Sequence, residues 1–387
     1  MGKDKTKYKT THTRSAAKQA EHAERYSPYR RKAEKQWDKG TVDYVAPLFE
    51  NEFNTGRMNS ARVTGRFAVH PSTLKTNDKR TRVRVRNPYN VDGGNPSGGP
   101  RLLFTRFPKV VKQKVAAEMG RRIALMRLKI PVRRRKDGLP NFGRDANRKG
   151  INQGPKPKCP TKHHGTWQPR SKRPRITAEW NRLSLPAKKA LNDALEFGGR
   201  HIFDRLDKIV RREYPEIVET MMIVRCWVLH HSDIRKTFDE WPGLNLGPMF
   251  NTIAITDRGS KRSHVDWLDH KQIPAIVVPL GNFGQSCICF PQLHKKFAIR
   301  SGDAFGAASR ILSHYAQVLG GGQRDCLTLF THNSLVVAAQ RWWKTLTDRE
   351  KAWRLRLAKK YDVRKYRSEV LKVRSKGGAK KGGSKKR

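Results

Sequence analysis

The chain has few acidic residues and few apolar ones. It contains 33 Asp and Glu against 83 Lys and Arg, for a formal net charge of +50, and only 36% of its 387 residues are hydrophobic. A compact body with this charge would repel itself. The composition therefore indicates basic segments outside a folded core, a polyanionic partner, or both.

Long hydrophobic runs and a cysteine framework are also missing. No apolar run approaches the roughly 20 residues that span a bilayer, so we expect no membrane association. The opening "MGKDKTKYKT" has no apolar core of a secretory signal. Five cysteines, an odd number, do not suit a secreted disulfide framework and favour a reducing intracellular compartment.

The excess charge is unevenly distributed. Between Arg225 and His332 there are twelve Lys and Arg and eight Asp and Glu, so about +46 of the net +50 lies in the flanks. The middle of the chain is therefore expected to be a nearly neutral globular unit between basic, largely disordered arms.

Residues 1–175 read as a basic, low-complexity and mostly disordered N-terminal region. "RTRVRVR" alternates as a cationic edge strand would, and Gly- and Pro-rich segments indicate loops. Apolar residues recur near helical spacing in one place and predict a possible helix at 110–130. They are Val111, Val115, Met119, Ile123 and Met126.

From residue 176 the composition changes. Residues 185–218 predict one or two helices, and seven β-rich runs follow, separated by turn signals. The runs are "TMMIVRCWVLH", "FNTIAITD", "AIVVPLG", "SCICFP", "KKFAIRSGDAFGA", "RILSHYAQV" and "DCLTLFTH". Closely spaced strands after a helical lead-in predict a barrel or a sandwich over residues 176–335.

Residues 336–387 are expected to form a C-terminal helix and a basic tail. Thr347 and Glu350 have the spacing of a capping box. Trp342, Trp343 and Trp353 predict a seam packed on the barrel, with a stacking platform as the alternative.

One short motif, "SHVDWLD", carries possible chemistry. His264 and Asp266 are two residues apart, so on a strand both side chains project to the same face. His314 lies 50 residues downstream. Two His and one carboxylate form the facial triad that binds Fe(II) and leaves positions open, whereas an isolated H-x-D is more often a surface turn.

Arg324 follows His314 by ten residues. The planar fork of an arginine pairs with a carboxylate through two hydrogen bonds, so this position suits the distal carboxylate of 2-oxoglutarate.

These motifs resemble a known family. The segments between and after them contribute to the resemblance: "VVPLGNFGQSCICFP", "IRSGDAFGAASRILSH" and "GGQRDCLTLFTH". They look like the fungal branch of the TET/J-binding-protein family of 2-oxoglutarate/Fe(II) dioxygenases, which oxidise 5-methylpyrimidines in DNA. The resemblance covers about residues 195–335. It implies an α+β, mainly β core: a double-stranded β-helix (jelly-roll) barrel with supporting helices.

The resemblance also implies roles for single residues, with Fe(II), 2-oxoglutarate and O₂ as cofactor and co-substrates. The expected iron ligands and catalytic residues are His264, Asp266 and His314. The expected 2-oxoglutarate-binding residues are Arg324, Cys326 in place of the usual Ser, and an Arg before H-x-D such as Arg262. The expected base-binding residues are Asp269 and His332.

The most favoured function is therefore oxidation of 5-methylcytosine in double-stranded DNA, by a nuclear and monomeric enzyme. Two alternatives stay open. One is a dioxygenase of another substrate, such as an alkylated or RNA base or a basic protein. The other is a degenerate, transposon-associated protein that binds nucleic acid without catalysis.

Overall fold

A computed structural model of the 387-residue chain describes residues 41–46, 74–77, 81–90, 92, 99–130, 161–169, 173–257, 263–284, 286–318 and 322–361, with side chains omitted at 76 and 77. The chain divides into two units, Met1–Val42 and Asp43–Arg387. The second unit contains all the helices and nearly all the strands discussed below.

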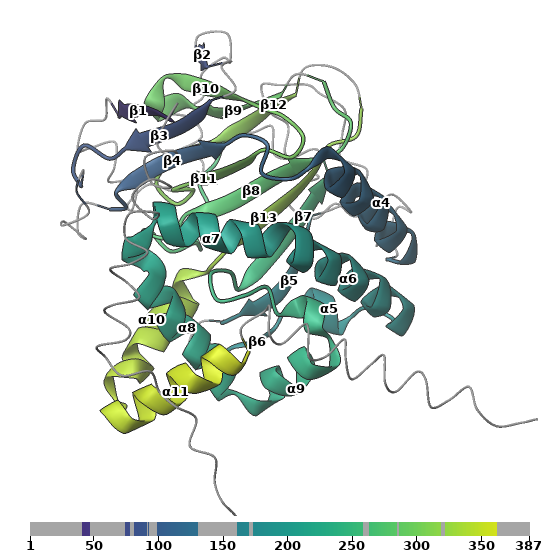
Figure 1. The fold of residues 1–387 in the computed structure, drawn as a ribbon, viewed down its shortest axis with the longest axis vertical. Helices are drawn as coiled ribbons and strands as arrows, with labels where there is room; N and C mark the ends of the chain where they lie inside the picture. Colours follow the sequence, from purple (N-terminus) through teal and green to yellow (C-terminus); the bar gives the residue numbers. More distant parts are fainter. Residues whose placement is uncertain are drawn as a thin grey trace, which may run out of the picture. The chain divides into compact units, whose positions relative to one another are not determined.

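The larger of two β-sheets has nine strands in the order β1-β3-β4-β11-β8-β13-β7-β5-β6 (Figure 1). These are β1 (Thr41–Val45), β3 (Arg82–Arg86), β4 (Leu102–Phe107), β11 (Ala304–Ala307), β8 (Ala275–Leu280), β13 (Asp325–Phe330), β7 (Thr252–Asp257), β5 (Lys162–Trp167) and β6 (Arg175–Ile176). From β3 to β6 each neighbouring pair is antiparallel.

The smaller sheet has four strands in the order β12-β9-β10-β2. They are β12 (Tyr315–Val318), β9 (Ser286–Phe290), β10 (Lys295–Ile299) and β2 (Lys75–Asn77). β9 pairs antiparallel with both β12 and β10, and β2 adds a parallel edge.

The two sheets pack face to face through aromatic side chains. The ring of Phe104 on β4 lies 4.3 Å from Phe297 and 4.9 Å from Phe290 on the small sheet, centroid to centroid. All three rings are fully buried. Rings of this size dominate core energetics, so this contact holds the sandwich together.

The structure confirms a β-rich α+β core. Among the described residues the strands form two facing sheets and no closed barrel. The physical reason is that β3 and β4 extend one side of the large sheet and β5 and β6 extend the other, so its edges do not meet.

Strands from early in the chain belong to this sheet. β4 pairs with β11, with Phe107 opposite Ala304, and β5 pairs with β7, with His164 opposite Ile253. The sheet therefore begins well before the expected boundary at residue 176. The range 110–130 contains α4 (Gln113–Lys129), which buries Met119, Ile123 and other apolar side chains of one face.

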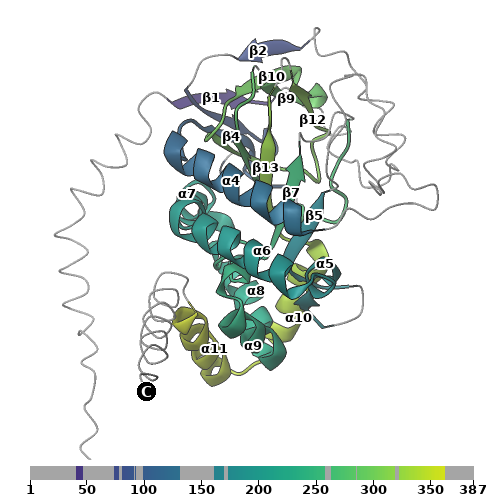
Figure 2. The same cartoon turned by 90° about the vertical axis from the view of Figure 1, so that its right-hand side faces the viewer.

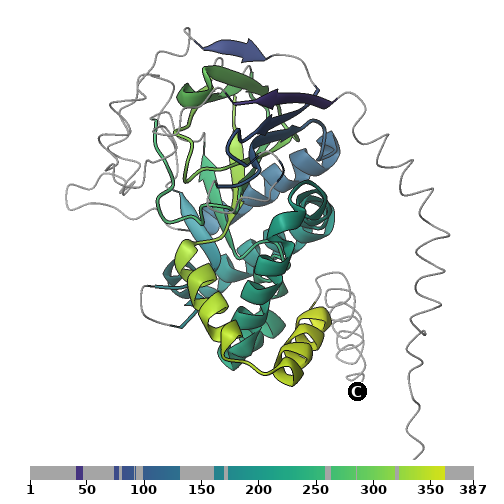
Figure 3. The same cartoon turned by 90° about the vertical axis from the view of Figure 1, so that its left-hand side faces the viewer.

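Helices cover the other face of the large sheet, as the two side views show (Figures 2 and 3). Besides α4, the described residues contain α5 (Ala178–Asn181), α6 (Leu185–Gly198), the π-helical turn η5 (Gly199–Phe203), α7 (Asp204–Glu213), α8 (Val218–His230), α9 (Ser232–Glu240), α10 (Asn333–Lys344) and α11 (Asp348–Lys360). Three short 3₁₀ turns connect elements: η6 (Pro215–Ile217), η7 (Pro242–Leu244) and η8 (Pro291–Leu293). No helix in the described part of the chain is long and apolar enough to cross a membrane.

The first expected strand, "TMMIVRCWVLH", is wrong: these residues lie in α8. Met221, Val224, Cys226, Val228 and Leu229 are all buried there. A run buried on most of its sides has no clear hydrophobic period. The helix α8 that contains this run has 13 residues, a length that suits a helix better than a strand.

The C-terminal helices pack on α8 rather than on the sheets. The Trp342 ring lies 5.1 Å from both Trp227 and His230 of α8. The expected capping box is confirmed: the Thr347 side chain accepts from the Glu350 backbone N–H, and the Glu350 side chain accepts from the Thr347 backbone N–H.

Two polar contacts attach the early strands to the helix layer. Arg84 on β3 donates two hydrogen bonds to the carboxylate of Glu213, at 2.7 and 3.0 Å. The Tyr214 hydroxyl lies 2.7 Å from the Thr105 hydroxyl on β4. Glu213 and Tyr214 are buried, so these contacts replace water where apolar packing alone would leave polar groups unsatisfied.

The buried imidazole of His164 on β5 should make the fold acid-sensitive. Neither ring nitrogen has a hydrogen-bond partner among the described residues. Burial, helped by the nearby His163 and Lys162, lowers the pKa of His164 to about 3, against about 6.5 in an unfolded chain. The unfolded state therefore binds a proton first, and the free energy of unfolding should fall as the pH drops from about 6.5 toward 3.

His164→Leu replaces the titratable imidazole with an apolar side chain of similar size. We expect the free energy of unfolding of the variant, measured in urea, to fall less than that of the wild type between pH 6.5 and 4, and the difference between the two to level off below the folded pKa. Parallel pH dependence in the two proteins would show that His164 is not the responsible group.

Candidate active site

Backbone pairing brings the two candidate histidine ligands together. His264 and His314 form an antiparallel bridge, in which the N–H of each donates to the carbonyl of the other, at 3.1 and 2.9 Å. The neighbouring hydroxyls of Ser263 and Ser313 lie 2.5 Å apart and are buried. A pair 50 residues apart in sequence is thus fixed by main-chain geometry.

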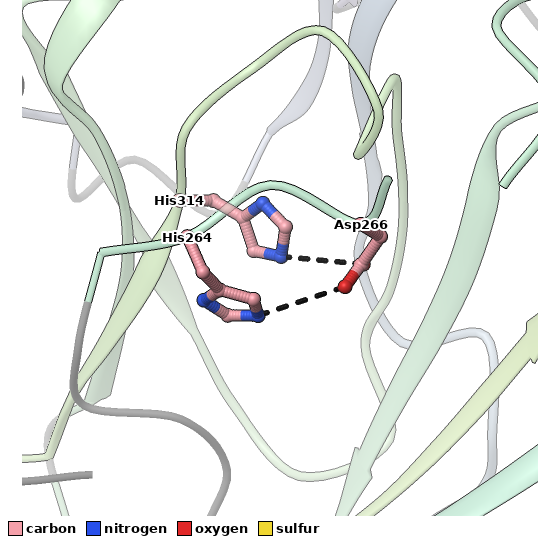
Figure 4. Close-up of side chains that lie close together, drawn as sticks. All are labelled: His264, Asp266 and His314. Atoms are coloured by element: carbon pink, nitrogen blue, oxygen red, sulfur yellow. Dashed lines mark ion pairs between the residues drawn. The ribbon is translucent and has the colours of Figure 1, made fainter. Parts of the chain in front are cut away.

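Asp266 completes the group from a short loop. Its N–H donates to the Ser309 carbonyl at 2.9 Å, which aims the side chain at the two imidazoles. The Nε2 atoms of His264 and His314 each lie 3.7 Å from one carboxylate oxygen of Asp266. Figure 4 shows all three side chains pointing toward one another.

The three side chains fit a divalent metal. One ligand atom of each lies within 4.8 Å of the others, and they are the one such group found in the described residues. At 3.7 Å the His–Asp contacts are too long for hydrogen bonds. An ion about 2.1 Å from each ligand separates two ligand atoms by about 3.0–3.4 Å, so a shift of a few tenths of an ångström brings each His–Asp pair to that separation. Two imidazoles and a carboxylate are the donor set of non-haem Fe(II).

The His314 ring is oriented by its second nitrogen. Nδ1 lies 3.0 Å from the Leu312 carbonyl, so the tautomer with a proton on Nδ1 donates there and leaves Nε2 as a ligand. Gln292 stiffens this turn: its Oε1 accepts from the Ser313 N–H at 2.5 Å, and its Nε2 donates to the Ile311 carbonyl at 3.2 Å.

Arg324 lies between the two sheets, just before β13. Its side chain is buried, and Nη1 donates to the Ser286 hydroxyl on β9 at 2.5 Å. Ser286 pairs with Val318, four residues after His314 on the same segment. Four strand residues cover about 13 Å, so the guanidinium and the histidines share one sheet interface at different depths.

The start of β13 is also held from α4. Arg127 pairs with the buried Asp325 carboxylate at 2.5 Å, and the Gln323 side chain donates to the same oxygen at 3.1 Å. These contacts flank Arg324 on both sides. Cys326 is buried two residues farther along the strand. Arg262, the other expected 2-oxoglutarate contact, lies outside the described residues.

Asp269 and His332 form a second pair beside the metal group. They are bridged backbone to backbone, and His332 Nδ1 lies 3.9 Å from Asp269 Oδ1. The Ser309 hydroxyl donates to Asp269 Oδ2 at 3.0 Å. The Asp269 N–H donates to the Asp266 carbonyl at 3.0 Å, so the pair is attached to the metal-binding loop.

Burial shifts the titration of both groups. It raises the pKa of the Asp269 carboxyl well above its usual range, and the nearby Asp266 charge adds to the effect. Burial also lowers the pKa of His332. Both shifts favour uncharged side chains, as expected where burial excludes water.

The structure adds residues that the sequence did not single out. Ser309 supports both Asp266 and Asp269, and Ser286 contacts Arg324. Phe330 places its ring 5.1 Å from His332 and 5.7 Å from His163, which comes from β5. Ser286, Ser309 and His163 belong to no sequence motif, and His163 lies about 100 residues before His264. Only the alternation within "DCLTLFTH" could have placed Phe330 beside His332.

Comparison with known proteins gives only distant structural similarity. No family model and no curated protein matches the chain. A solved structure, "NgTET1 in complex with 5mC DNA", is similar with a TM-score of 0.43 and 14% identity, over 71% of this chain and 88% of that one. At this level the function must be argued from the geometry of the site itself.

The metal group predicts a simple binding defect. His314→Ala removes one of three ligands, and we expect the affinity for Fe(II) or Co(II) to fall by about 100-fold or more. Anaerobic titration followed by the cobalt absorption spectrum measures it. His201→Ala, at an exposed position of η5, is the matched control and should bind metal as the wild type does. Equal affinity in the two variants would contradict the assignment.

Proposed function

We propose that this protein is an Fe(II)- and 2-oxoglutarate-dependent dioxygenase that oxidises a methylated base in DNA, with 5-methylcytosine as the favoured substrate. The observation that carries the proposal is the convergence of His264, Asp266 and His314 on one point. A buried arginine in the same sheet interface supports it.

The strand order supports a double-stranded β-helix as the core of this enzyme. In the large sheet the central order is β7-β13-β8-β11, and in the small sheet β12-β9-β10. The His264 segment pairs with the chain just before β12, which adds a fourth element there. Two four-stranded antiparallel layers with such non-sequential neighbours are the arrangement of a jelly roll.

In the proposed enzyme the iron ligands are His264, Asp266 and His314. The bound iron with 2-oxoglutarate would supply the activation of O₂ and the oxidation of a C–H bond. The side chains contribute geometry: they occupy one side of the ion and leave the other open to co-substrates. Their exposed side-chain fractions of 23%, 38% and 15% are compatible with access from solvent.

Arg324 is proposed to bind the distal carboxylate of 2-oxoglutarate. Its guanidinium offers several donors in a plane, which pair with a carboxylate through two hydrogen bonds. Ser286 orients this guanidinium: its hydroxyl accepts from Arg324 and donates to the Gln317 carbonyl at 3.0 Å. A five-carbon diacid bound at the iron would extend toward Arg324 within the same sheet interface.

Asp269 and His332 are proposed to contact an extruded base. A base inside a duplex cannot reach a buried metal, so an enzyme of this kind must extrude it from the stack. Asp269 accepts from the Ser309 hydroxyl with one oxygen and can accept from the exocyclic amino group of cytosine with the other. Two such donors favour the ionised form of this carboxyl, whose pKa burial raises. The Phe330 ring beside His332 supplies an aromatic wall.

The remaining expectations stay predictions. The basic arms would contact phosphates without regard to sequence. Nuclear location and a monomeric state follow from the same composition and are open to direct measurement.

Replacing the arginine fork by a point charge tests the co-substrate site. Arg324→Lys should raise the 2-oxoglutarate concentration needed for half-maximal turnover by about 10- to 100-fold, since a charge-assisted hydrogen bond contributes about 1.5–3 kcal/mol. Succinate formation at varied 2-oxoglutarate measures the effect. Arg300→Lys, at an exposed position, is the control. An unchanged requirement in Arg324→Lys would mean that another residue binds this carboxylate.

Base choice is tested at Asp269. Asp269→Asn keeps the shape but can turn a donor toward the base, so the preference should shift from 5-methylcytosine toward thymine. A mismatched buried contact costs about 1–3 kcal/mol, or about 5- to 150-fold in the ratio of rates. Mass spectrometry of matched duplexes with one 5-methylcytosine or one thymine measures that ratio.

A wild-type ratio in the Asn variant would show that Asp269 does not read the base. Oxidation of neither duplex by the wild type, with succinate still formed, would point to another substrate such as an RNA base or a basic protein. If no succinate forms either, the catalytically inactive alternative is favoured.

A further inference from the structure

The last two described helices carry an unusual charge. Residues 333–361, which contain α10 and α11, have eight Lys and Arg and two Asp and Glu, a net of +6. The equally long segment 185–213, which forms α6, η5 and α7, has seven and five, a net of +2. Both segments lie on the surface of the same unit, so the C-terminal pair is more positive than α6–α7 at equal length.

Most of this charge is directed to solvent. The exposed basic residues of the pair are Arg341, Lys344, Arg349, Arg356, Lys359 and Lys360. Lys351 pairs with Asp348 on its own helix, at 3.2 Å. Basic groups fixed on helices without a matching number of carboxylates form a surface of positive potential, which attracts polyanions.

The pair is held in place from behind. Trp342 packs on Trp227 and His230 of α8, and the Arg354 guanidinium lies 5.5 Å from the Trp342 ring and 4.4 Å from the Trp353 ring. Trp342 thus fixes α10 against α8, while the cations remain at the surface. A surface held this way loses little entropy when it binds.

The surface starts at the candidate active site. His332, which lies beside Asp269, is the N-cap residue of α10. From there the 12 residues of α10 run to Lys344, a length of about 18 Å at 1.5 Å per residue. α11 follows after a short turn, and both helices lie beside α8 in Figures 1 and 3.

We propose that the exposed basic residues of α10 and α11 form a docking surface for the phosphate backbone of duplex DNA, at a fixed distance from the base that enters the site. The proposal rests on the proposed function for its substrate, a base in DNA. At 3.4 Å per nucleotide, 18 Å corresponds to about five base pairs on one side of the target. The contacts would set affinity and position and would carry no sequence preference.

The salt dependence of DNA binding tests the surface. The triple variant Lys344→Gln, Arg349→Gln, Arg356→Gln is compared with the matched variant Lys189→Gln, Arg205→Gln, Lys208→Gln, which removes three exposed charges from α6 and α7. Each lost phosphate contact lowers the slope of log K against log salt by about 0.9. Fluorescence anisotropy of the full chain with a labelled duplex, without metal or 2-oxoglutarate, gives the slopes.

We expect the α10–α11 variant to lose about two to three units of slope and the matched variant to lose less than one. The difference should require duplex arms longer than about five base pairs and vanish on arms of about three. Circular dichroism and thermal unfolding check that both variants are folded.

Equal slopes in the two variants, or a difference that persists on the short arms, would overturn the proposal. The proposal would also be overturned if the α10–α11 variant kept the wild-type salt slope for DNA but no longer bound polyglutamate. That result would assign the surface to an acidic protein partner. Because this assay contains no reaction, its failure is separate from failure of the dioxygenase assignment. DNA docking without base oxidation would contradict only the latter.

Discussion

The backbone pairing of His264 with His314 is the constraint on which the candidate site depends. Two N–H···O=C bonds place the imidazoles side by side, and the Ser263–Ser313 hydroxyl contact and the Gln292 side chain support them. That pairing exists because His314 leads directly into β12, which β9 holds in the small sheet. The small sheet in turn is fixed by the packing of Phe104 against Phe290 and Phe297. The site is therefore only as rigid as this aromatic contact.

β13 connects two parts of the site, Arg324 and His332, along one line. Arg324 stands before its first residue and His332 follows just after its last, and the strand is paired on both sides, with β7 and β8. A strand in the middle of a sheet cannot slip by one residue without turning every side chain to the other face. The residues proposed to bind the co-substrate and the base, Arg324 and His332, are thus kept at a set separation by a single paired strand.

The site was far more predictable from sequence than the sheet that contains it. His264, Asp266 and His314 could be grouped because metal ligands are restricted to a few residue types, and strand alternation relates positions two apart. The roles of β4 and β5 could not be foreseen, since their partners are far along the chain and their sequences carry no sign of them. The helix α8 was misread for a different reason. A segment buried on most sides lacks the periodicity that separates helix from strand.

The pairing of β4 with β11 also bears on how the chain folds. Phe107 lies opposite Ala304, about 200 positions later, whereas β9 and β10 are joined by a turn of four residues. Closing the short hairpin costs little chain entropy, but joining β4 to β11 requires a very long loop to close. Chains rich in such distant pairings fold slowly. The β9–β10 hairpin should therefore form early, and β11 should wait with one edge uncovered until the N-terminal strands arrive.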